Sequence, residues 1–200
     1  MDQITLASYD AQAQALAATQ RSKTPLALQR LITHWFVPGA ATADIGCGSG
    51  RDTAWLAAQG FPTIGVEPSA GMRAEAQAAF PQLDVRPDGL PELAGIPTAA
   101  FTNVLCSAVL MHLPADQQPS AVAALARIMR PGGRLVLTYR ASQVMDVREP
   151  DGRLYTPISA TELVTWCQAV GLQLLLQAED ADGGRPGVVW SSVVAERVHP

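Results

Sequence analysis

A glycine-rich segment over residues 43–51 contains the residues best suited to binding a ligand. Gly46, Gly48 and Gly50 stand at every second position, just after an apolar run that includes Asp44. Because glycine has no Cβ, such a backbone can turn sharply and approach a ligand closely. The segment therefore predicts a nucleotide-binding loop between a strand and a helix.

The neighbouring side chains indicate which kind of nucleotide this loop binds. A dinucleotide-binding loop reads G-x-G-x-x-G, and Arg51 occupies the position of its third glycine. A carboxylate at Asp44 would repel a pyrophosphate but suits a cationic ligand. S-adenosyl-L-methionine carries an ammonium and a sulfonium group, so the loop favours it over NAD.

At these residues the chain resembles the class I S-adenosylmethionine-dependent methyltransferases, whose glycine-rich motif is similar to residues 44–50. Other parts of that family's pattern are similar to residues 63–68, 88–91, 104–113 and 129–135. The resemblance implies S-adenosyl-L-methionine as the cofactor and S-adenosyl-L-homocysteine as its product.

The resemblance also implies roles for acidic residues that follow the strands. Glu67 stands where the family binds the ribose hydroxyls, and Asp88 where it contacts the adenine amino group. Asp84 lies in the same short segment as Asp88 and is an alternative to it. The whole expected cofactor-binding set is Asp44, Gly46, Cys47, Gly48, Gly50, Arg51, Asp52, Glu67, Pro68, Met72, Asp88, Gly89, Leu90, Ser107, Ala108 and Val109.

His112 and Tyr9 are the candidate catalytic residues. His112 follows the segment expected beneath the reactive methyl group, and histidine changes its protonation near neutral pH. Its alternative role is to pack against the cofactor or to bond a backbone carbonyl. Tyr9 resembles a family position that closes over the cofactor, and its alternative is ordinary core packing.

Several cationic and aromatic residues are candidates for binding the methyl acceptor. They are Tyr139, Arg140, Arg148, Arg153, Tyr155 and Arg185. Their clustering suggests an anionic or aromatic acceptor, and the alternative is a solvated loop. Trp190 is expected in the core.

The chain alternates strand and helix patterns, which favours an α/β fold with right-handed crossovers. We expect strands at 41–45, 63–66, 83–86, 102–108, 134–139, 172–177 and 188–195, with helices at 9–20, 25–36, 51–59, 69–80, 117–129 and 159–171. Thr24, Ser69 and Ser159 are expected helix caps. The resemblance implies a Rossmann-like, mostly parallel seven-stranded sheet of order 3-2-1-4-5-7-6, flanked by helices and with its last strand antiparallel.

We expect one methyltransferase domain over residues 1–200, in which helices within 1–38 cover the cofactor site. Residues 140–158, a long polar loop, and 178–187 are the expected substrate-side loops. We expect the chain to act as a monomer or homodimer.

Composition indicates which binding partners and which cellular compartment to expect. A net charge of −4 with 14 Lys and Arg argues against nucleic acid, whose binding requires neutralisation of phosphates. The sequence shows neither a basic leader nor a long apolar run, so we expect no membrane contact and a cytoplasmic protein. The three cysteines have no metal-binding spacing, and we expect them to be reduced, with no metal site.

The expected reaction is in-line transfer of a methyl group to a small-molecule acceptor. Residues 47–51 and 55–60 also resemble the tellurite-resistance methyltransferases, so a metalloid acceptor is an alternative. A nicotinamide oxidoreductase is disfavoured, because the single lysine, Lys23, precedes the sheet. A partner subunit that binds the cofactor without catalysis is the remaining alternative.

Overall fold

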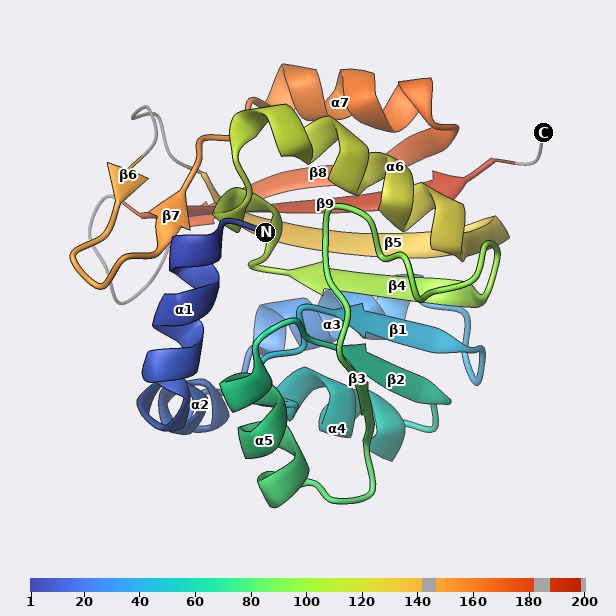
Figure 1. Ribbon diagram of the computed structural model, residues 1–200. Coiled ribbons are helices and arrows are strands. Elements are labelled where there is room, and N and C mark those ends of the chain that lie inside the picture. The colour runs from blue at the N-terminus through green and yellow to red at the C-terminus, as the bar shows by residue number, and fades with distance from the viewer. Residues whose placement is uncertain (142–146, 182–187, 199–200) are drawn as a thin grey trace.

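The computed structural model describes residues 1–141, 147–181 and 188–198 (Figure 1). Its helices are α1 (Gln3–Ala11), α2 (Ala13–Arg21), α3 (Leu26–Trp35), α4 (Arg51–Ala58), α5 (Ala70–Ala79), α6 (Gln118–Ile128) and α7 (Ala160–Ala169), with short 3-10 turns η1 (Leu110–His112) and η2 (Ala115–Gln117). Its strands are β1 (Thr42–Ile45), β2 (Thr63–Val66), β3 (Asp84–Arg86), β4 (Phe101–Ser107), β5 (Met129–Ala141), β6 (Val147–Arg148), β7 (Leu154–Tyr155), β8 (Leu172–Ala181) and β9 (Val189–Arg197).

The main sheet has seven strands in the order β3-β2-β1-β4-β5-β9-β8. β1 pairs in parallel with both β2 and β4, whereas β9 is antiparallel to β5 and to β8. Numbered along the chain within this sheet, the order is 3-2-1-4-5-7-6 with an antiparallel last strand. The expected Rossmann-like architecture is confirmed.

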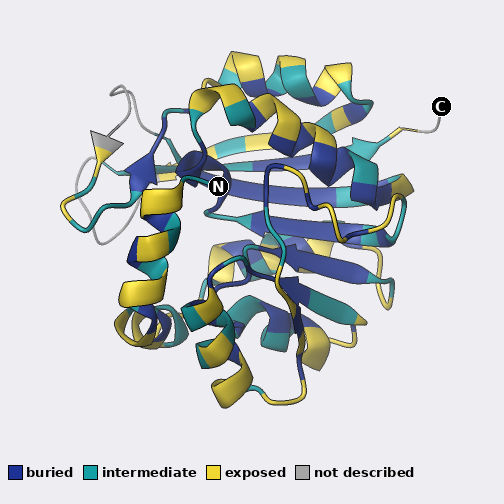
Figure 2. Cartoon of the chain, viewed as in Figure 1, coloured by how far each residue is buried: buried dark blue, intermediate teal, exposed yellow. Residues whose placement is uncertain are grey.

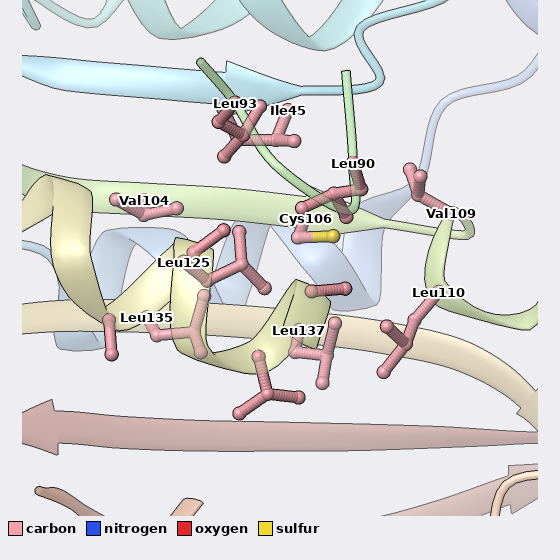
Figure 3. Close-up of a cluster of buried hydrophobic side chains, with 14 of the residues drawn as sticks. Ile45, Leu90, Leu93, Val104, Cys106, Val109, Leu110, Leu125, Leu135 and Leu137 are labelled. Carbon is pink, nitrogen blue, oxygen red and sulfur yellow. The ribbon is translucent and has the colours of Figure 1, made fainter. Parts of the chain in front are cut away.

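Helices cover both faces of the sheet, and Figure 2 shows that its central strands are buried. Successive strand residues point to opposite faces. On one face Val104 packs with Leu125 of α6 in the cluster drawn in Figure 3. On the other face Leu105 packs with Leu28 of α3 and Leu56 of α4. Burial on both faces explains why these strands read as continuous apolar runs.

Two of the three expected helix caps are present. The Ser69 side chain accepts the Met72 N–H at the start of α5, and Ser159 accepts the Glu162 N–H at the start of α7. The expected cap at Thr24 is wrong, because α3 begins at Leu26 without a side-chain cap.

The expected helix over residues 9–20 is two helices that meet at Gln12. The first begins earlier than predicted, because the Asp2 carboxylate accepts the Thr5 N–H at 2.8 Å and caps α1. The periodicity of residues 9–20 gave no indication of this upstream cap.

The expected polar loop over residues 140–158 contains a short hairpin, in which Val147 pairs with Tyr155 and Arg148 with Leu154. The hairpin lies beside α1 (Figure 1), and the Leu154 N–H donates to Thr5 Oγ1 at 2.9 Å. Two-residue strands are too short to produce an alternating sequence pattern. The hairpin depends on tertiary contacts that the local sequence does not show.

The Pro-Gly-Gly segment bulges out of β5. Between two paired positions β4 advances from Phe101 to Asn103 while β5 advances from Met129 to Arg134. At Gly133 the backbone passes so close to β4 that an added Cβ would lie 2.6 Å from the Thr102 carbonyl oxygen. Only glycine fits at this approach.

We expect Gly133→Ala to lower the free energy of unfolding by about 3 kcal/mol, because both nearest atoms are backbone oxygens that cannot rotate away. Gly39→Ala is the matched control, since Gly39 has φ +66° but no heavy atom within 4 Å of the added Cβ. Its cost should be about 1 kcal/mol from backbone strain alone. Urea denaturation of both variants checks the difference, and equal losses would contradict it.

Candidate active site

The glycine-rich loop leaves β1 in a tight turn and enters α4. Gly46, Gly48 and Gly50 have φ values of 72°, 52° and 74°, in the left-handed region that favours glycine. The Gly46 and Cys47 N–H groups donate to the Val66 carbonyl at 2.7 and 3.1 Å. The loop is therefore fastened to the end of β2.

Close approach from two sides explains why glycine stands at positions 46 and 48 of this loop. A Cβ at Gly46 would overlap the Val109 side chain that follows β4, and one at Gly48 would lie 2.7 Å from Gln20 Oε1. Gln20 Oε1 also accepts the Ser49 N–H at 3.0 Å. The second helix therefore packs directly on the loop.

Glu67 directly follows β2 and is buried beside the loop. Its two carboxylate oxygens accept the N–H groups of Gly48 at 2.9 Å and Ser69 at 2.8 Å. Burial raises the pKa of Glu67, and these two N–H donors act in the opposite direction. The carboxylate borders the cavity, where it can accept hydrogen bonds from ligand hydroxyl groups.

Asp44 lies at the end of β1 but is fully enclosed. Thr53 of α4 donates its hydroxyl to Asp44 Oδ2 at 2.7 Å. Burial, followed by the nearby Asp52, raises the pKa of Asp44. Arg51 pairs with Asp52 at 2.7 Å and donates to the Gln20 carbonyl at 3.0 Å. In the described structure these expected cofactor residues hold the loop, α2 and α4 together.

A cavity of about 210 Å³ opens beside the loop. The expected site residues that border it are Tyr9, Gly46, Gly48, Glu67, Ser107, Ala108, Val109, His112, Arg140, Arg153 and Tyr155. These residues come from α1, from segments at the carboxyl ends of β1, β2, β4 and β5, and from β7 and the position just before it. Ligands of open α/β sheets bind at this edge.

His112 and Tyr9 form a hydrogen-bonded pair across the cavity wall. His112 Nδ1 lies 2.6 Å from the Leu154 carbonyl oxygen, and its Nε2 lies 3.1 Å from the Tyr9 hydroxyl. Only a protonated ring nitrogen can donate to a carbonyl, so Nδ1 carries the hydrogen. Nε2 is then the acceptor, and the Tyr9 hydroxyl donates to it.

Both members of this pair are uncharged near neutral pH. Burial lowers the pKa of His112 to about 4, against the opposing effect of the Leu154 carbonyl. Burial also raises the pKa of Tyr9 to about 12. The pair therefore holds a fixed pattern of donors and acceptors in the described structure.

Aromatic and cationic side chains of β5 and the hairpin form part of the cavity wall. The guanidinium carbons of Arg140 and Arg153 lie 5.0 and 5.7 Å from the centre of the Tyr155 ring. Arg140 pairs with Glu149 at 3.0 Å, and Arg153 pairs with Asp151 at 2.8 Å. This part of the wall contains three of the six expected acceptor residues: Arg140, Arg153 and Tyr155.

Four expected site residues do not border the cavity and have other contacts. Asp88 accepts the Gly89 and Gly95 N–H groups, both at 2.7 Å, and so holds its own loop. Met72 packs with small residues of α2, and Tyr139 lies in the core. Arg148 pairs with Asp2 at 2.9 Å.

The remaining expected cofactor residues that do not border the cavity are Cys47, Gly50, Pro68, Gly89 and Leu90. Arg185 lies outside the described residues, as do positions 142–146 and 182–187 of the two expected substrate-side loops.

Four residues outside the expected set also border the cavity: Met1, Gln20, Met111 and Trp190. Met111 adjoins His112, so its position was open to prediction. Gln20 reaches the site through packing between distant segments and has no motif to mark it. Trp190 was expected in the core, and its ring is partly buried against that core while bordering the cavity.

Among residues 1–141, 147–181 and 188–198, no group of three or more His, Cys, Asp or Glu is arranged to hold a metal ion. In the same described ranges, no helix is long and apolar enough to cross a membrane. Cys47, Cys106 and Cys167 are unpaired and buried, as expected.

Comparison with known proteins supports this reading of the loop and the sheet. A family model described as a methyltransferase domain matches residues 43–137. The ubiquinone biosynthesis O-methyltransferase of Hahella chejuensis is 30% identical over 115 residues, which cover 56% of this chain and 48% of that protein. The trans-aconitate 2-methyltransferase of Deinococcus radiodurans is 36% identical over 126 residues, which cover 61% of this chain and 45% of that protein. The chain thus spans about half the length of these curated relatives.

Among solved structures, the 1,6-didemethyltoxoflavin-N1-methyltransferase of Burkholderia thailandensis, crystallised with 1,6-didemethyltoxoflavin and S-adenosylhomocysteine, matches with a TM-score of 0.78. The match covers 98% of this chain and 88% of that one at 20% sequence identity, and therefore shows the shared fold. Residues 43–137 thus match a methyltransferase domain, and the sheet order is the one that the resemblance to class I S-adenosylmethionine-dependent methyltransferases implied.

Proposed function

We propose that this chain transfers the methyl group of S-adenosyl-L-methionine to a small-molecule acceptor. The observation that carries the proposal is the single cavity that Glu67 and the glycine loop share with Tyr9, His112 and Tyr155. When bound, the cofactor supplies a methyl group on a sulfonium centre, which is a good leaving group. The residues that would bind the cofactor and those that would bind the acceptor border one cavity, so the two reacting groups can meet there.

The residues on the loop side fit the cofactor. The buried Glu67 carboxylate suits the two ribose hydroxyls, and the bare loop permits close approach to the backbone at Gly46 and Gly48. We assign the contact beneath the methyl group to Ser107, Ala108 and Val109, which border the same cavity. We keep Asp88 as the adenine contact, although its carboxylate already accepts two backbone N–H groups.

We propose that His112 and Tyr9 orient the reactants. A base with a pKa of about 4 is a weak proton acceptor at neutral pH, and His112 Nε2 already accepts the Tyr9 hydroxyl. Through this pair η1 is joined to α1, and His112 is also bonded to the Leu154 carbonyl of the hairpin. Orientation of bound reactants alone is worth roughly 7 to 11 kcal/mol in favourable cases.

We further propose that residues 1–200 work as one domain in the cytoplasm. Tyr9 and Gln20 place α1 and α2 on the border of the cavity, so these two helices belong to the same site, whereas α3 packs against Leu105 and Leu56. The unpaired cysteines are typical of a reducing compartment. The net charge of −4 favours a small-molecule acceptor over nucleic acid.

Binding of S-adenosylhomocysteine tests the cofactor assignment. Ligand at 100 times its dissociation constant should stabilise the protein by about 2.7 kcal/mol, which a melting experiment detects. Glu67→Gln should weaken binding at least tenfold, about 1.4 kcal/mol, because a charged acceptor is lost. Glu162→Gln, on the exposed surface of α7, is the control. A melting shift with NAD but none with S-adenosylhomocysteine would overturn the proposal.

We expect His112→Ala and Tyr9→Phe to lower turnover much more than they weaken S-adenosylhomocysteine binding, because both remove the bond that orients the acceptor wall. Production of S-adenosylhomocysteine with a panel of oxygen, nitrogen, sulfur and metalloid acceptors measures turnover. A pH–rate inflection that disappears in His112→Ala would instead identify His112 as a base. Cofactor binding without turnover on any acceptor would indicate a non-catalytic subunit.

The lowered pKa of His112 also predicts a pH effect on stability. An unfolded histidine titrates near 6.5, so the folded state binds fewer protons between that pH and about 4. The contribution of His112 to the free energy of unfolding is complete above pH 6.5 and is lost as the pH falls. Between pH 7.5 and pH 5, the free energy of unfolding of the wild type should fall by about 2 kcal/mol more than that of His112→Gln. Urea denaturation at both pH values measures this, and a pH-independent difference would contradict the buried, neutral imidazole.

A further inference from the structure

Two arginines border the cavity near Tyr155. Arg140 lies near the end of β5, and Arg153 directly precedes β7. Their side chains are only 25% and 22% exposed. Both guanidinium groups approach the Tyr155 ring, which is itself buried. Half-buried cations in a cavity wall interact more strongly with a ligand charge than cations in open solvent.

The charges along the cavity are asymmetric. Glu67 is the acidic side chain on its border, and it stands on the loop side. Glu149 and Asp151 pair with the arginines but do not border the cavity. These carboxylates hold the guanidinium groups in place through hydrogen bonds of 3.0 and 2.8 Å. The acceptor wall therefore presents N–H donors, and a guanidinium recognises a carboxylate by paired hydrogen bonds.

Flat aromatic surfaces surround the same donors. The Tyr155 and His112 rings meet edge to face at 4.8 Å between centroids, and the Arg153 guanidinium carbon also lies 5.7 Å from the Tyr9 ring centre. Trp190 borders the cavity as well. Such walls favour a planar apolar body over a flexible polar one.

We infer that Arg140 and Arg153 select a small planar organic acid as the methyl acceptor and hold its anionic group beside Tyr155. The inference rests on the proposed function. In this arrangement the anionic group anchors the acceptor, and the atom that takes the methyl group is a different one, turned toward Val109 and His112. Arg140 and Arg153 are specificity-determining residues in this scheme.

Calorimetric titration of protein saturated with S-adenosylhomocysteine tests the inference. The probes are benzoate, 3,4-dihydroxybenzoate and cinnamate, each compared with its primary amide, which has the same shape without the charge. At least one acid should bind roughly tenfold or more tightly than its amide, a difference of about 1.4 kcal/mol. Arg140→Gln and Arg153→Gln should abolish that preference, whereas Arg140→Lys and Arg153→Lys should retain part of it.

Arg30→Gln, on the exposed face of α3, is the control for loss of one positive charge and should leave the preference unchanged. Melting temperatures of all variants separate misfolding from lost recognition, and the Lys variants keep the test valid if a Gln variant unfolds. Amides that bind as tightly as acids, or acids that do not bind at several millimolar, would overturn the inference while S-adenosylhomocysteine binding still supports the proposed function. If S-adenosylhomocysteine itself does not bind, the proposed function fails, and titration of the ligand-free protein with the same pairs still decides the role of the arginines.

Discussion

The site depends on the parallel pairing of β1 with the strands on both sides. Asp44 lies opposite Gly65 of β2 and Leu105 of β4 in this register. Because the three strands run in one direction, their carboxyl ends meet at one edge, where the glycine loop, Glu67 and Ser107 follow. A one-residue slip of β2 would turn its side chains to the opposite face of the sheet. The common position of the glycine loop, Glu67 and Ser107 therefore depends on the register of β1 with β2 and β4.

The acceptor wall is assembled differently, from segments that are far apart in the sequence. His112 joins η1 to α1 through Tyr9 and to β7 through Leu154, and the imidazole does this as a neutral group. The fold alone does not decide which atom is methylated, because one architecture can carry many chemistries. The hairpin and the first helix, which contribute Tyr9, Arg153 and Tyr155 to the border of the cavity, lie outside the region matched to the family model.

The sequence predicted the order of the strands and the places of the glycine loop and Glu67, for a physical reason. These are local motifs whose places follow from the strand–helix–strand pattern. Tyr139 and Arg140 show the limit: they are adjacent in β5, so one faces the core with Leu137 and the other borders the cavity. Which residue takes which side depends on register, and a run of this composition did not reveal it. Gln20 was missed because packing between distant segments brings it to the cavity.

The contacts of α1 have a consequence for biosynthesis. Residues of α1 leave the ribosome early, yet Thr5 accepts from Leu154 and Tyr9 donates to His112, both of which are made much later. Chains fold while they are synthesised, at roughly 5 to 20 residues per second. The first helix must therefore wait several seconds for the partners that fix it over the cavity. During that interval the segments from β1 to β4 are already synthesised, so the growing chain contains the glycine loop before it contains Leu154, the partner of Thr5.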